Sequence, residues 1–316
     1  MSDAIRVVAL SGGIGGAKLA LGLYRALPAD SLMVACNTGD DFEHLGLSIS
    51  PDMDTVLYTL AGLANPQTGW GRADETWTFM QALESLGGET WFRLGDADLA
   101  IHVERTRRLT AGESLSDVSD DLCSRLGVRA RVVPMSDQPV RTMVHTDDGT
   151  LAFQRYFVQN RCQPEVTGFT FHGAGDAHPS LALWEALIGE ELQAVVICPS
   201  NPFISIDPIL AVPGLRGAIA DCGAPVLAVS PIIGGNAVKG PTAKMMSELG
   251  VPRSARAVAE HYDGLLSGFV LDDADKDTIT DLPCLHTRIL MESDEDKTTL
   301  AKQVLEFARR ISDKAR

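Results

Sequence analysis

The chain has 316 residues, 45% of them apolar, which is enough material for a large buried core. Its formal net charge of −15, from 42 acidic against 27 basic residues, repels nucleic acids and anionic membranes. We therefore expect no nucleic-acid or membrane partner. An anionic small substrate has to be held by local cations, backbone amides or a metal ion.

The six cysteines are scattered, and several lie in apolar runs, which is typical of small core residues in a reducing compartment. The first residues lead directly into an apolar run without a signal-peptide pattern, and no apolar stretch reaches the ~20 residues of a membrane span. The sequence therefore predicts a cytoplasmic protein without a membrane segment or a zinc site.

Apolar runs of strand length alternate with helical patterns along most of the chain. The strand candidates are 5–10, 32–36, 192–198, 225–233, 268–271 and 286–291, and the clearest helical patterns are 15–27 and 294–311. Continuous rather than alternating apolar runs are typical of strands buried on both faces. The sequence therefore predicts an α/β fold that is Rossmann-like and doubly wound, with a mainly parallel sheet. Ligands of such folds bind beyond the carboxyl ends of the strands.

Two stretches interrupt this rhythm. Residues 74–86 and 113–126 have helical patterns with charged outer faces, and 129–171 has the pattern of short strands with turns. We interpret 75–165 as an inserted helical and small-strand cap, and 1–74 together with 166–316 as the nucleotide-binding core.

A glycine-rich turn, SGGIGGAK, follows the first strand candidate at residues 11–18. Glycines let a phosphate approach the backbone, and the start of the following helix offers free N–H groups. The turn is not a P-loop, because no Ser or Thr follows Lys18, and Lys18 also replaces the third glycine of a dinucleotide fingerprint. We expect Gly12, Gly13, Gly15 and Lys18 to bind an anionic ligand, with a purely structural turn as the alternative.

Four aspartates follow the second strand candidate, in Asn37-Thr38-Gly39-Asp40-Asp41 and in Pro51-Asp52-Met53-Asp54. Next to a presumed phosphate loop they favour a hard divalent cation, Mg²⁺ above all, which binds one or two carboxylates together with water and substrate phosphate. In the alternative interpretation, Asp52 caps a helix at about 53–63 and the other aspartates are solvated.

Three further stretches carry candidate binding residues. Arg93 follows Trp91 and Phe92 and is either a ring-stacking residue or a surface arginine. Ser200 and Asn201 lie in a turn fixed by prolines, where Asn201 is able to hydrogen-bond a base or ribose. A second glycine loop, with Gly234, Gly235, Asn236 and Lys239, precedes a helix expected from Pro241 and is another candidate anion site. The seven histidines show no ligand spacing, and we interpret most of them as structural or solvated.

Taken together and in this order, the motifs from Gly12 to Lys244 resemble the 2-phospho-L-lactate transferase family of coenzyme F-420 biosynthesis. The resemblance rests on the glycine turn, Asn37-Thr38-x-x-Asp41, Pro51-Asp52-x-Asp54-Thr55-x-x-Tyr58, Leu94-Gly95-Asp96-x-Asp98, Pro134-Met135-Ser136-Asp137, Pro199-Ser200-Asn201-Pro202 and Val229-Ser230-Pro231-Ile232-Ile233-Gly234. It implies a Rossmann-like homodimer that uses Mg²⁺. Its activity would be transfer of a phospholactyl group from lactyl-2-diphospho-5′-guanosine to the deazaflavin Fo, which yields GMP and coenzyme F-420-0. The phosphoenolpyruvyl or phosphoglyceryl analogue of the donor is an alternative.

The resemblance also implies residue roles. Fo is expected to contact Asp54 and Arg93, and the guanosine diphosphate is expected to face the second glycine loop and the turn with Ser200 and Asn201. Asp40 and Asp54 are expected to hold Mg²⁺ and to act in catalysis, and Asp54 has an alternative role in orienting the attacking hydroxyl. Asn37 and Thr38 complete the predicted substrate contacts.

Two rival functions share parts of this pattern. A family of nucleotide-sugar-binding regulatory proteins of carbon metabolism has the glycine loop and the paired aspartates, but there the aspartates run into a glycine- and serine-rich stretch. Here Phe42-Glu43-His44-Leu45 follows, which favours the transferase. The missing third glycine argues against the second rival, an NAD(P)-dependent oxidoreductase.

Overall fold

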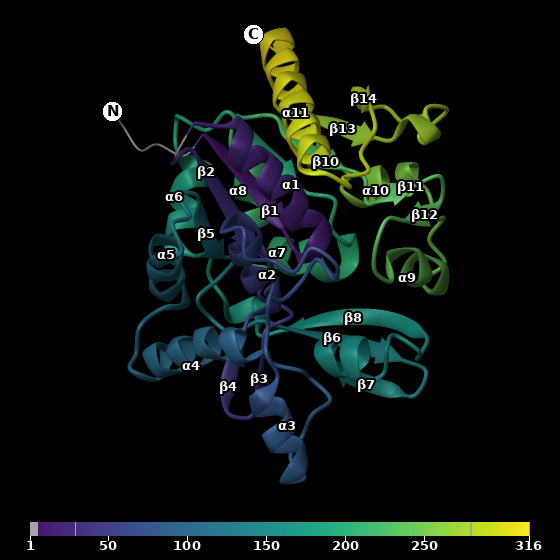
Figure 1. Cartoon of the computed structure of the whole chain (residues 1–316). Coiled ribbons are helices and arrows are strands. Elements are labelled where there is room, and N and C mark those ends of the chain that lie inside the picture. The colour runs from purple at the N-terminus through teal and green to yellow at the C-terminus, as the bar shows by residue number, and fades with distance from the viewer. Residues whose placement is uncertain (1–5, 29, 279, 316) are drawn as a thin grey trace.

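Seven parallel strands form the centre of the molecule (Figure 1). The structure is a computed structural model that describes residues 6–28, 30–278 and 280–315. In spatial order the strands are β14 (Cys284–His286), β13 (Gly268–Leu271), β10 (Val226–Val229), β9 (Ala194–Ile197), β1 (Val7–Ser11), β2 (Leu32–Cys36) and β5 (Arg131–Pro134). Every neighbouring pair is parallel, with Val7 of β1 opposite both Leu32 and Ala194.

Burial on both faces explains the continuous apolar runs of these strands. Every residue of β1, β2, β9, β10 and β13 is buried. Within β1, Val7 and Ala9 belong to one hydrophobic cluster, whereas Val8 and Leu10 belong to another on the opposite face. The predicted α/β fold with a parallel sheet is therefore confirmed.

Helices cover both faces of the sheet. The cluster around Val7 and Ala9 includes residues of α1 (Gly13–Ala26), α2 (Pro51–Leu60), α5 (Leu115–Arg125) and α11 (Asp294–Ala315). The opposite cluster includes residues of α6 (Leu181–Ile188), α7 (Asp207–Leu210), α8 (Leu215–Ala220), α9 (Thr242–Glu248) and α10 (Ala255–His261). None of the described helices combines the length and the apolar character that a membrane crossing needs.

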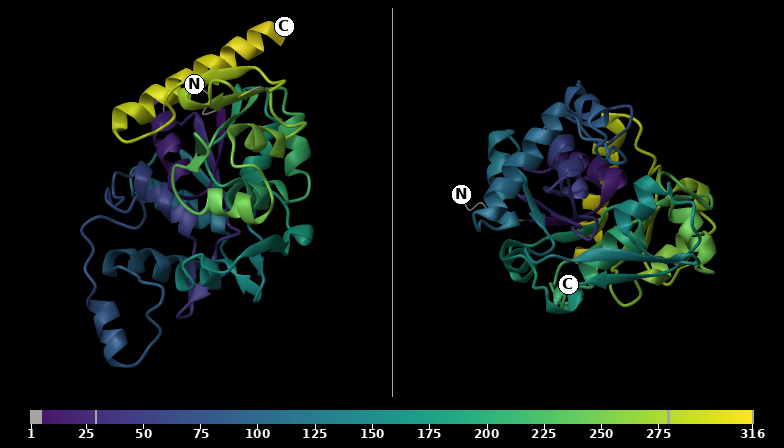
Figure 2. Two further views of the ribbon diagram at one scale, coloured as in Figure 1. Left: turned by 90° about the vertical axis from the view of Figure 1, so that its right-hand side faces the viewer. Right: turned by 90° about the horizontal axis from the view of Figure 1, so that it is seen from below.

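Smaller elements lie below the sheet in the view of Figure 1. They are the hairpin of β3 (Phe42–His44) and β4 (Leu47–Ile49), helices α3 (Thr78–Ser85) and α4 (Asp96–Thr110), and an antiparallel sheet of β7 (Gly149–Ala152), β6 (Arg141–Thr146) and β8 (Val166–His172). The remaining elements are the hairpin of β11 (Ile232–Ile233) and β12 (Asn236–Ala237) and the short turns η1 (Arg155–Gln159), η2 (Ala174–Asp176), η3 (Pro202–Ile206) and η4 (Asp273–Asp275). Figure 2 shows α3 at the end of the molecule opposite to α11.

The predicted cap, residues 75–165, is not a separate unit outside the central sheet. β5 falls within this range, yet it pairs with β2 and completes one edge of the central sheet, with Arg131 opposite Met33. Helix α5 also belongs to the core cluster. Conversely, the β3–β4 hairpin precedes residue 75 but contacts α4, where the Ser48 amide donates to Thr106 Oγ1 at 2.8 Å. The elements around the sheet edge therefore come from several parts of the chain.

Candidate functional site

A cavity of about 600 Å³ lies at the carboxyl ends of the central strands. Gly12 follows β1 directly and lines it, as do Asp40 in the turn after β2, Pro199 after β9 and Ser230 after β10. Further parts of the wall come from α1, α2, α4, η1, η3 and several connecting segments. This is the position where a doubly wound sheet binds its ligands.

The glycine turn forms the start of α1 and packs tightly against the turn after β9. A Cβ atom on Gly15 would lie 2.3 Å from the carbonyl oxygen of Pro199, so that only glycine fits without displacement of the backbone. Ser200 Oγ joins the two turns, since it donates to the Gly12 carbonyl at 2.7 Å and accepts from the Gly12 amide at 3.2 Å. Gly13 has a φ of +64°, which also favours glycine.

Asp52 has a role that the sequence did not predict. It lies in the first turn of α2, but its Oδ1 accepts from the Gly13 amide at 2.7 Å, so that it caps α1 rather than its own helix. Asn37 Nδ2 donates to Asp52 Oδ2 at 2.9 Å and so fixes the carboxylate. The predicted anion site at the start of α1 therefore already holds one carboxylate. Burial raises the pKa of Asp52, and the hydrogen bonds from Asn37 and Gly13 oppose this shift.

Asp40 and Asp41 are both buried, but their surroundings differ. Asp40 lines the cavity, and its Oδ1 has no hydrogen-bond partner within the described chain. Burial, and then the neighbouring Asp52, raise the pKa of Asp40 well above its usual range. Asp41 Oδ2 accepts from Ser50 Oγ at 2.7 Å, and burial raises the pKa of Asp41 to about 7. Each of the two side chains thus keeps one buried oxygen, Oδ1, without a partner among the described residues, but only Asp40 lines the cavity.

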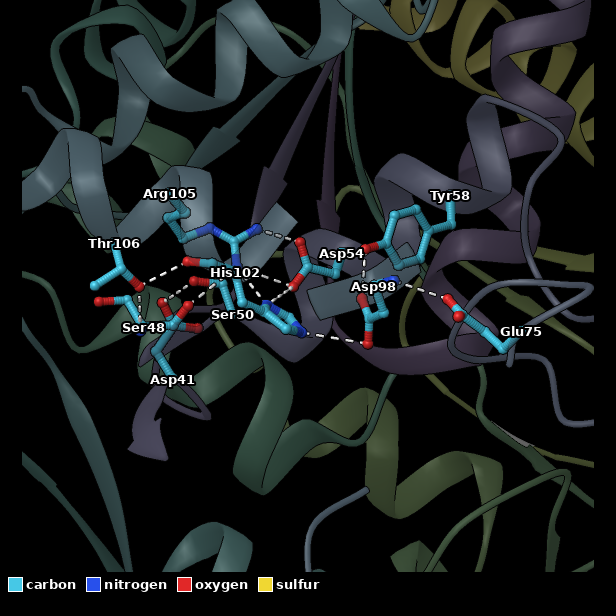
Figure 3. A network of polar contacts seen from close by, with 10 residues as sticks. All are labelled: Asp41, Ser48, Ser50, Asp54, Tyr58, Glu75, Asp98, His102, Arg105 and Thr106. Atoms are coloured by element: carbon cyan, nitrogen blue, oxygen red, sulfur yellow. Dashed lines mark hydrogen bonds and ion pairs between the residues drawn. The ribbon is translucent and has the colours of Figure 1, made fainter. Parts of the chain in front are cut away.

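Asp54 is the centre of a buried polar network (Figure 3). Arg105 of α4 binds both of its oxygens, with 3.0 Å between Nη1 and Oδ2 and a short contact from Nη2 to Oδ1. His102 Nδ1 lies 3.7 Å from Asp54 Oδ2, and its Nε2 lies 3.2 Å from Asp98 Oδ2. The Tyr58 hydroxyl donates to the other oxygen of Asp98. One histidine thus lies between two carboxylates that line the cavity.

Helix α4 is the main feature that the sequence interpretation missed. Its buried side chains are Ile101, His102 and Arg105, so that most of its buried face is polar and gives no apolar periodicity. A usable signal is present in the spacing of Asp98, His102 and Arg105, since residues separated by four and three positions share one face of a helix. Our interpretation of His102 as one of the uninformative histidines was therefore incomplete.

Aromatic side chains line another part of the cavity. Trp91 and Phe92 pack edge to face, with ring centroids 5.8 Å apart, and Phe153 and Phe157, which also line the cavity, are stacked at 5.3 Å. Arg93 also lines the cavity, and its guanidinium lies 4.2 Å from the centroid of the Trp77 ring. Arg93 is therefore a stacking residue here, on a ring of the chain itself.

Lys18 and Lys239 both line the cavity. The Lys18 ammonium donates to the Met291 carbonyl at 2.7 Å, and the Lys239 ammonium donates to the Thr68 carbonyl at 2.6 Å. Burial lowers the pKa of Lys18, and the positive charges of Lys297 and Lys239 lower it further. Within the described residues neither lysine has an ion-pair partner, so that both charges are available to an anionic ligand.

Several predicted contact residues do not line the cavity. Asn37 and Thr38 lie beneath it, where Asn37 supports Asp52 and the Thr38 side chain is buried. Gly234 and Gly235 form the turn between β11 and β12, and Asn236 begins β12; the Gly234 amide donates to Asp275 Oδ2 at 3.0 Å. Only the end of this loop, from Val238 onward, reaches the cavity.

The predicted residues that do line it are Gly12, Gly13, Gly15, Lys18, Asp40, Asp54, Arg93, Ser200, Asn201 and Lys239. Asn201 contributes little free polarity, because its Oδ1 accepts from the Phe203 amide and its Nδ2 contacts Met245 Sδ. The cavity therefore combines two lysines, an aromatic wall and five acidic side chains, which are Asp40, Asp52, Asp54, Asp98 and Glu292.

No group of three His, Cys, Asp or Glu side chains among the described residues forms a complete metal site. Mg²⁺ does not need one, because it commonly binds one or two carboxylates and takes water and substrate phosphate as its other ligands. The unpartnered oxygen of Asp40 fits this requirement. Asp54 fits it poorly, because Arg105 already binds both of its oxygens.

The chain is similar over its whole length to curated proteins of bacteria and archaea. It is 41% identical to the phosphoenolpyruvate transferase of Streptomyces coelicolor, with 97% of this chain and 99% of that protein covered. It is 38% identical to the 2-phospho-L-lactate transferase of Methanosarcina mazei, with 95% and 99% covered. Among solved structures, a UPF0052 family protein from Bacillus halodurans superposes with a TM-score of 0.64 at 15% identity, which covers 96% of this chain and 99% of that one and supports the fold alone.

The family model described as 2-phospho-L-lactate transferase CofD matches residues 7–304, which include every residue that lines the cavity. The resemblance drawn from the sequence motifs is thereby confirmed. The chain belongs to the 2-phospho-L-lactate transferase CofD family and is an enzyme of the transferase class.

Proposed function

We propose that the protein transfers a three-carbon phospho-acid group from a guanosine-diphosphate-type donor to the terminal hydroxyl of the deazaflavin Fo. The products are GMP and coenzyme F-420-0 or its dehydro form. The observation that carries the proposal is one cavity with unpaired cations at one part of its wall and aromatic rings at another. The cations suit the diphosphate of the donor, and the rings suit the planar deazaflavin.

The proposed reaction forms a bond between the ribityl oxygen of Fo and the phosphorus that carries the three-carbon acid. The bond between this phosphorus and the GMP phosphate breaks, and GMP leaves. Asp54 accepts the hydrogen bond of the attacking hydroxyl and orients it, while the hydroxyl proton passes to Asp54 or to water. Lys18 and Lys239 offset the negative charge of the diphosphate. Such transfers depend mainly on position and charge, which agrees with the lack of a dedicated nucleophile in this scheme.

Mg²⁺ is part of the proposal, with Asp40 as its protein ligand. When bound, the ion neutralises charge on the diphosphate and stabilises the departing phosphate. Asp40 fits because it is buried, lines the cavity and has a carboxylate oxygen without a partner. We expect excess EDTA to abolish transfer and added Mg²⁺ to restore it. Full activity in EDTA would contradict the metal proposal and leave the assignment of donor and acceptor intact.

The identity of the three-carbon acid is proposed from the relatives. The relatives from Streptomyces coelicolor and Streptomyces griseus, 41% and 42% identical, are named phosphoenolpyruvate transferase, whereas the archaeal relative at 38% is named for 2-phospho-L-lactate. We therefore place the phosphoenolpyruvyl donor first and the phospholactyl and phosphoglyceryl donors after it.

The deciding experiment incubates the protein with Fo, Mg²⁺ and each of the three guanylylated acids, and identifies the products by mass. We expect GMP and one Fo adduct, with the highest kcat/KM for the phosphoenolpyruvyl donor. Asp54→Asn is expected to lower kcat at least 100-fold, whereas Asp148→Asn, in the exposed turn between β6 and β7, is the matched control and should remain active. Absence of any Fo adduct from the wild type would overturn the proposal.

The two rival functions predict different outcomes in simple binding experiments. A nucleotide-sugar-binding regulator would leave the fluorescence of Fo unchanged on mixing, and an oxidoreductase would bind NADH in a titration. We expect a change of Fo fluorescence and no binding of NADH. The homodimer implied by the resemblance stays a prediction, which light scattering of the purified protein measures.

A further inference from the structure

In the proposed reaction Arg105 acts on the substrates only through another residue, Asp54. It is 2% exposed and does not line the cavity, whereas Asp54, whose oxygens it binds, does. Its Nη1 also approaches the Ser48 carbonyl at 3.4 Å, which ties the guanidinium to the β3–β4 hairpin. Each carboxylate oxygen is able to accept more than one hydrogen bond. Asp54 therefore still has acceptor capacity toward the cavity when the planar guanidinium of Arg105 binds both of its oxygens.

His102 lies between the Arg105 guanidinium and a second carboxylate, Asp98. Its Nδ1 lies 3.4 Å from Arg105 Nη1, which is only able to donate, so that Nδ1 is the acceptor and the ring hydrogen is on Nε2. Nε2 faces Asp98 Oδ2 at 3.2 Å. Asp98 in turn accepts from the Tyr58 hydroxyl of α2. The two helices that carry Asp54 and Asp98 are therefore locked together by polar contacts on the cavity wall (Figure 3).

The charge balance of this cluster also depends on one residue. This residue is Arg105, the cation that pairs with Asp54. The carboxylates of Asp41, Asp54 and Asp98 surround it. A substrate with several negative charges would meet uncompensated carboxylates if the guanidinium were removed. Lysine keeps the charge but has no planar fork, so that it is unable to hold both oxygens in one plane.

From these contacts we propose that Arg105 and His102 are positioning residues that aim the Asp54 carboxylate at the acceptor hydroxyl. The inference rests on the proposed transfer to Fo and adds how the chain holds the group that orients the acceptor. Arg105 fixes the plane of the Asp54 carboxylate, and His102 supports the guanidinium from the side of Asp98.

A double-mutant cycle tests whether Arg105 acts through Asp54. We expect Arg105→Lys to lower kcat by about 10- to 100-fold, the range for a misplaced group, and to raise the KM for Fo while the KM for the donor changes little. In the Asp54→Asn background the same Arg105→Lys change should have almost no further effect, because the oriented carboxylate is already lost. A role limited to folding would lower activity equally in both backgrounds, and this additive result would overturn the inference.

Two further variants separate positioning from damage to the helix. Arg108→Lys is the matched control on α4, because Arg108 pairs with Glu113 and Asp121 outside the cavity, and its activity should stay near that of the wild type. His102→Gln places an amide N–H near the position of Nε2, so that it should retain much more activity than His102→Ala. Equal loss in both His102 variants would contradict the role of the Asp98 contact.

The same proteins are titrated with Fo alone, with fluorescence as the readout, so that the test does not depend on turnover. If the wild type transfers the group but the cycle is additive, the positioning inference fails and the proposed function stands. If the wild type binds Fo without transfer, the cycle is evaluated on the dissociation constants, and additivity there overturns the inference. If the wild type neither binds nor transfers, both are overturned.

Discussion

Gly15 sits where the start of α1 meets the turn after β9. The carbonyl of Pro199 occupies the space that a Cβ atom would need, at a distance of 2.3 Å. We expect Gly15→Ala to move α1 away from this turn, to lower the free energy of unfolding by about 1–3 kcal/mol and to reduce transfer activity. Gly217→Ala is the control, since Gly217 lies in α8 with open space around it. Thermal unfolding measures both, and an unchanged Tm in Gly15→Ala would refute the close approach.

His44 is a buried histidine that packs against Trp91 and Phe92 of the aromatic wall. Its ring lies 5.1 Å from that of Trp91, and burial lowers the pKa of His44 below its usual value. Because the unfolded chain then binds a proton more readily than the folded one, this contribution to stability is complete above about pH 6.5 and is lost as the pH falls below that value.

We therefore expect Tm to fall by about 2–4 °C between pH 7.5 and pH 5 through His44, with a parallel change in tryptophan fluorescence. In His44→Phe this part of the pH dependence should disappear. The exposed His178 serves as control, and His178→Gln should titrate as the wild type does. If His44→Phe retains the full dependence, another group causes it.

Helix α4 depends on a carboxylate from outside the helix. Glu75 accepts from the amides of Ala97 and Asp98, both at 2.8 Å, and so satisfies the start of the helix. We expect Glu75→Ala to cost about 1 kcal/mol of stability, as loss of an N-cap does, and to lower transfer activity because α4 carries Asp98, His102 and Arg105. Glu84→Ala, in the exposed part of α3, should change neither. Chemical denaturation and kcat/KM measure the two effects, and equal behaviour of the variants would contradict the capping role.

Elements with an apolar face could be predicted from the sequence, and elements with a polar buried face could not. β1 and β9 stand out because both of their faces are buried in hydrophobic clusters. α4 stays hidden because His102 and Arg105 fill its buried face. At the site, the sequence predicted that Lys18, Asp40 and Asp54 lie at one edge of the sheet, and all three line the cavity there. The partner of Lys18 is Met291 and the partner of Asp54 is Arg105. Both lie far away in sequence, so that no local sequence pattern predicts these contacts.

At the scale of the whole molecule, the net charge of −15 opposes the folded state, because a compact chain brings like charges closer together. Added salt screens this repulsion. We expect Tm to rise by several degrees between about 20 mM and 500 mM NaCl, with differential scanning fluorimetry as the measurement. The exposed pair Glu190 and Glu191 provides a control: the variant Glu190→Gln with Glu191→Gln should show a smaller rise. A Tm that stays constant or falls with salt would show that local ion pairs outweigh the net repulsion.

The walls of the cavity come from both ends of the chain, since the Lys18 ammonium rests on the Met291 carbonyl and β1 lies between β2 and β9. The second neighbour of β1 is β9, and during translation its residues 194–197 leave the ribosome long after β1 does. The segment with Met291, which forms another side of the binding site, leaves the ribosome later still. A nascent chain that has not yet reached residue 292 therefore lacks part of the cavity wall.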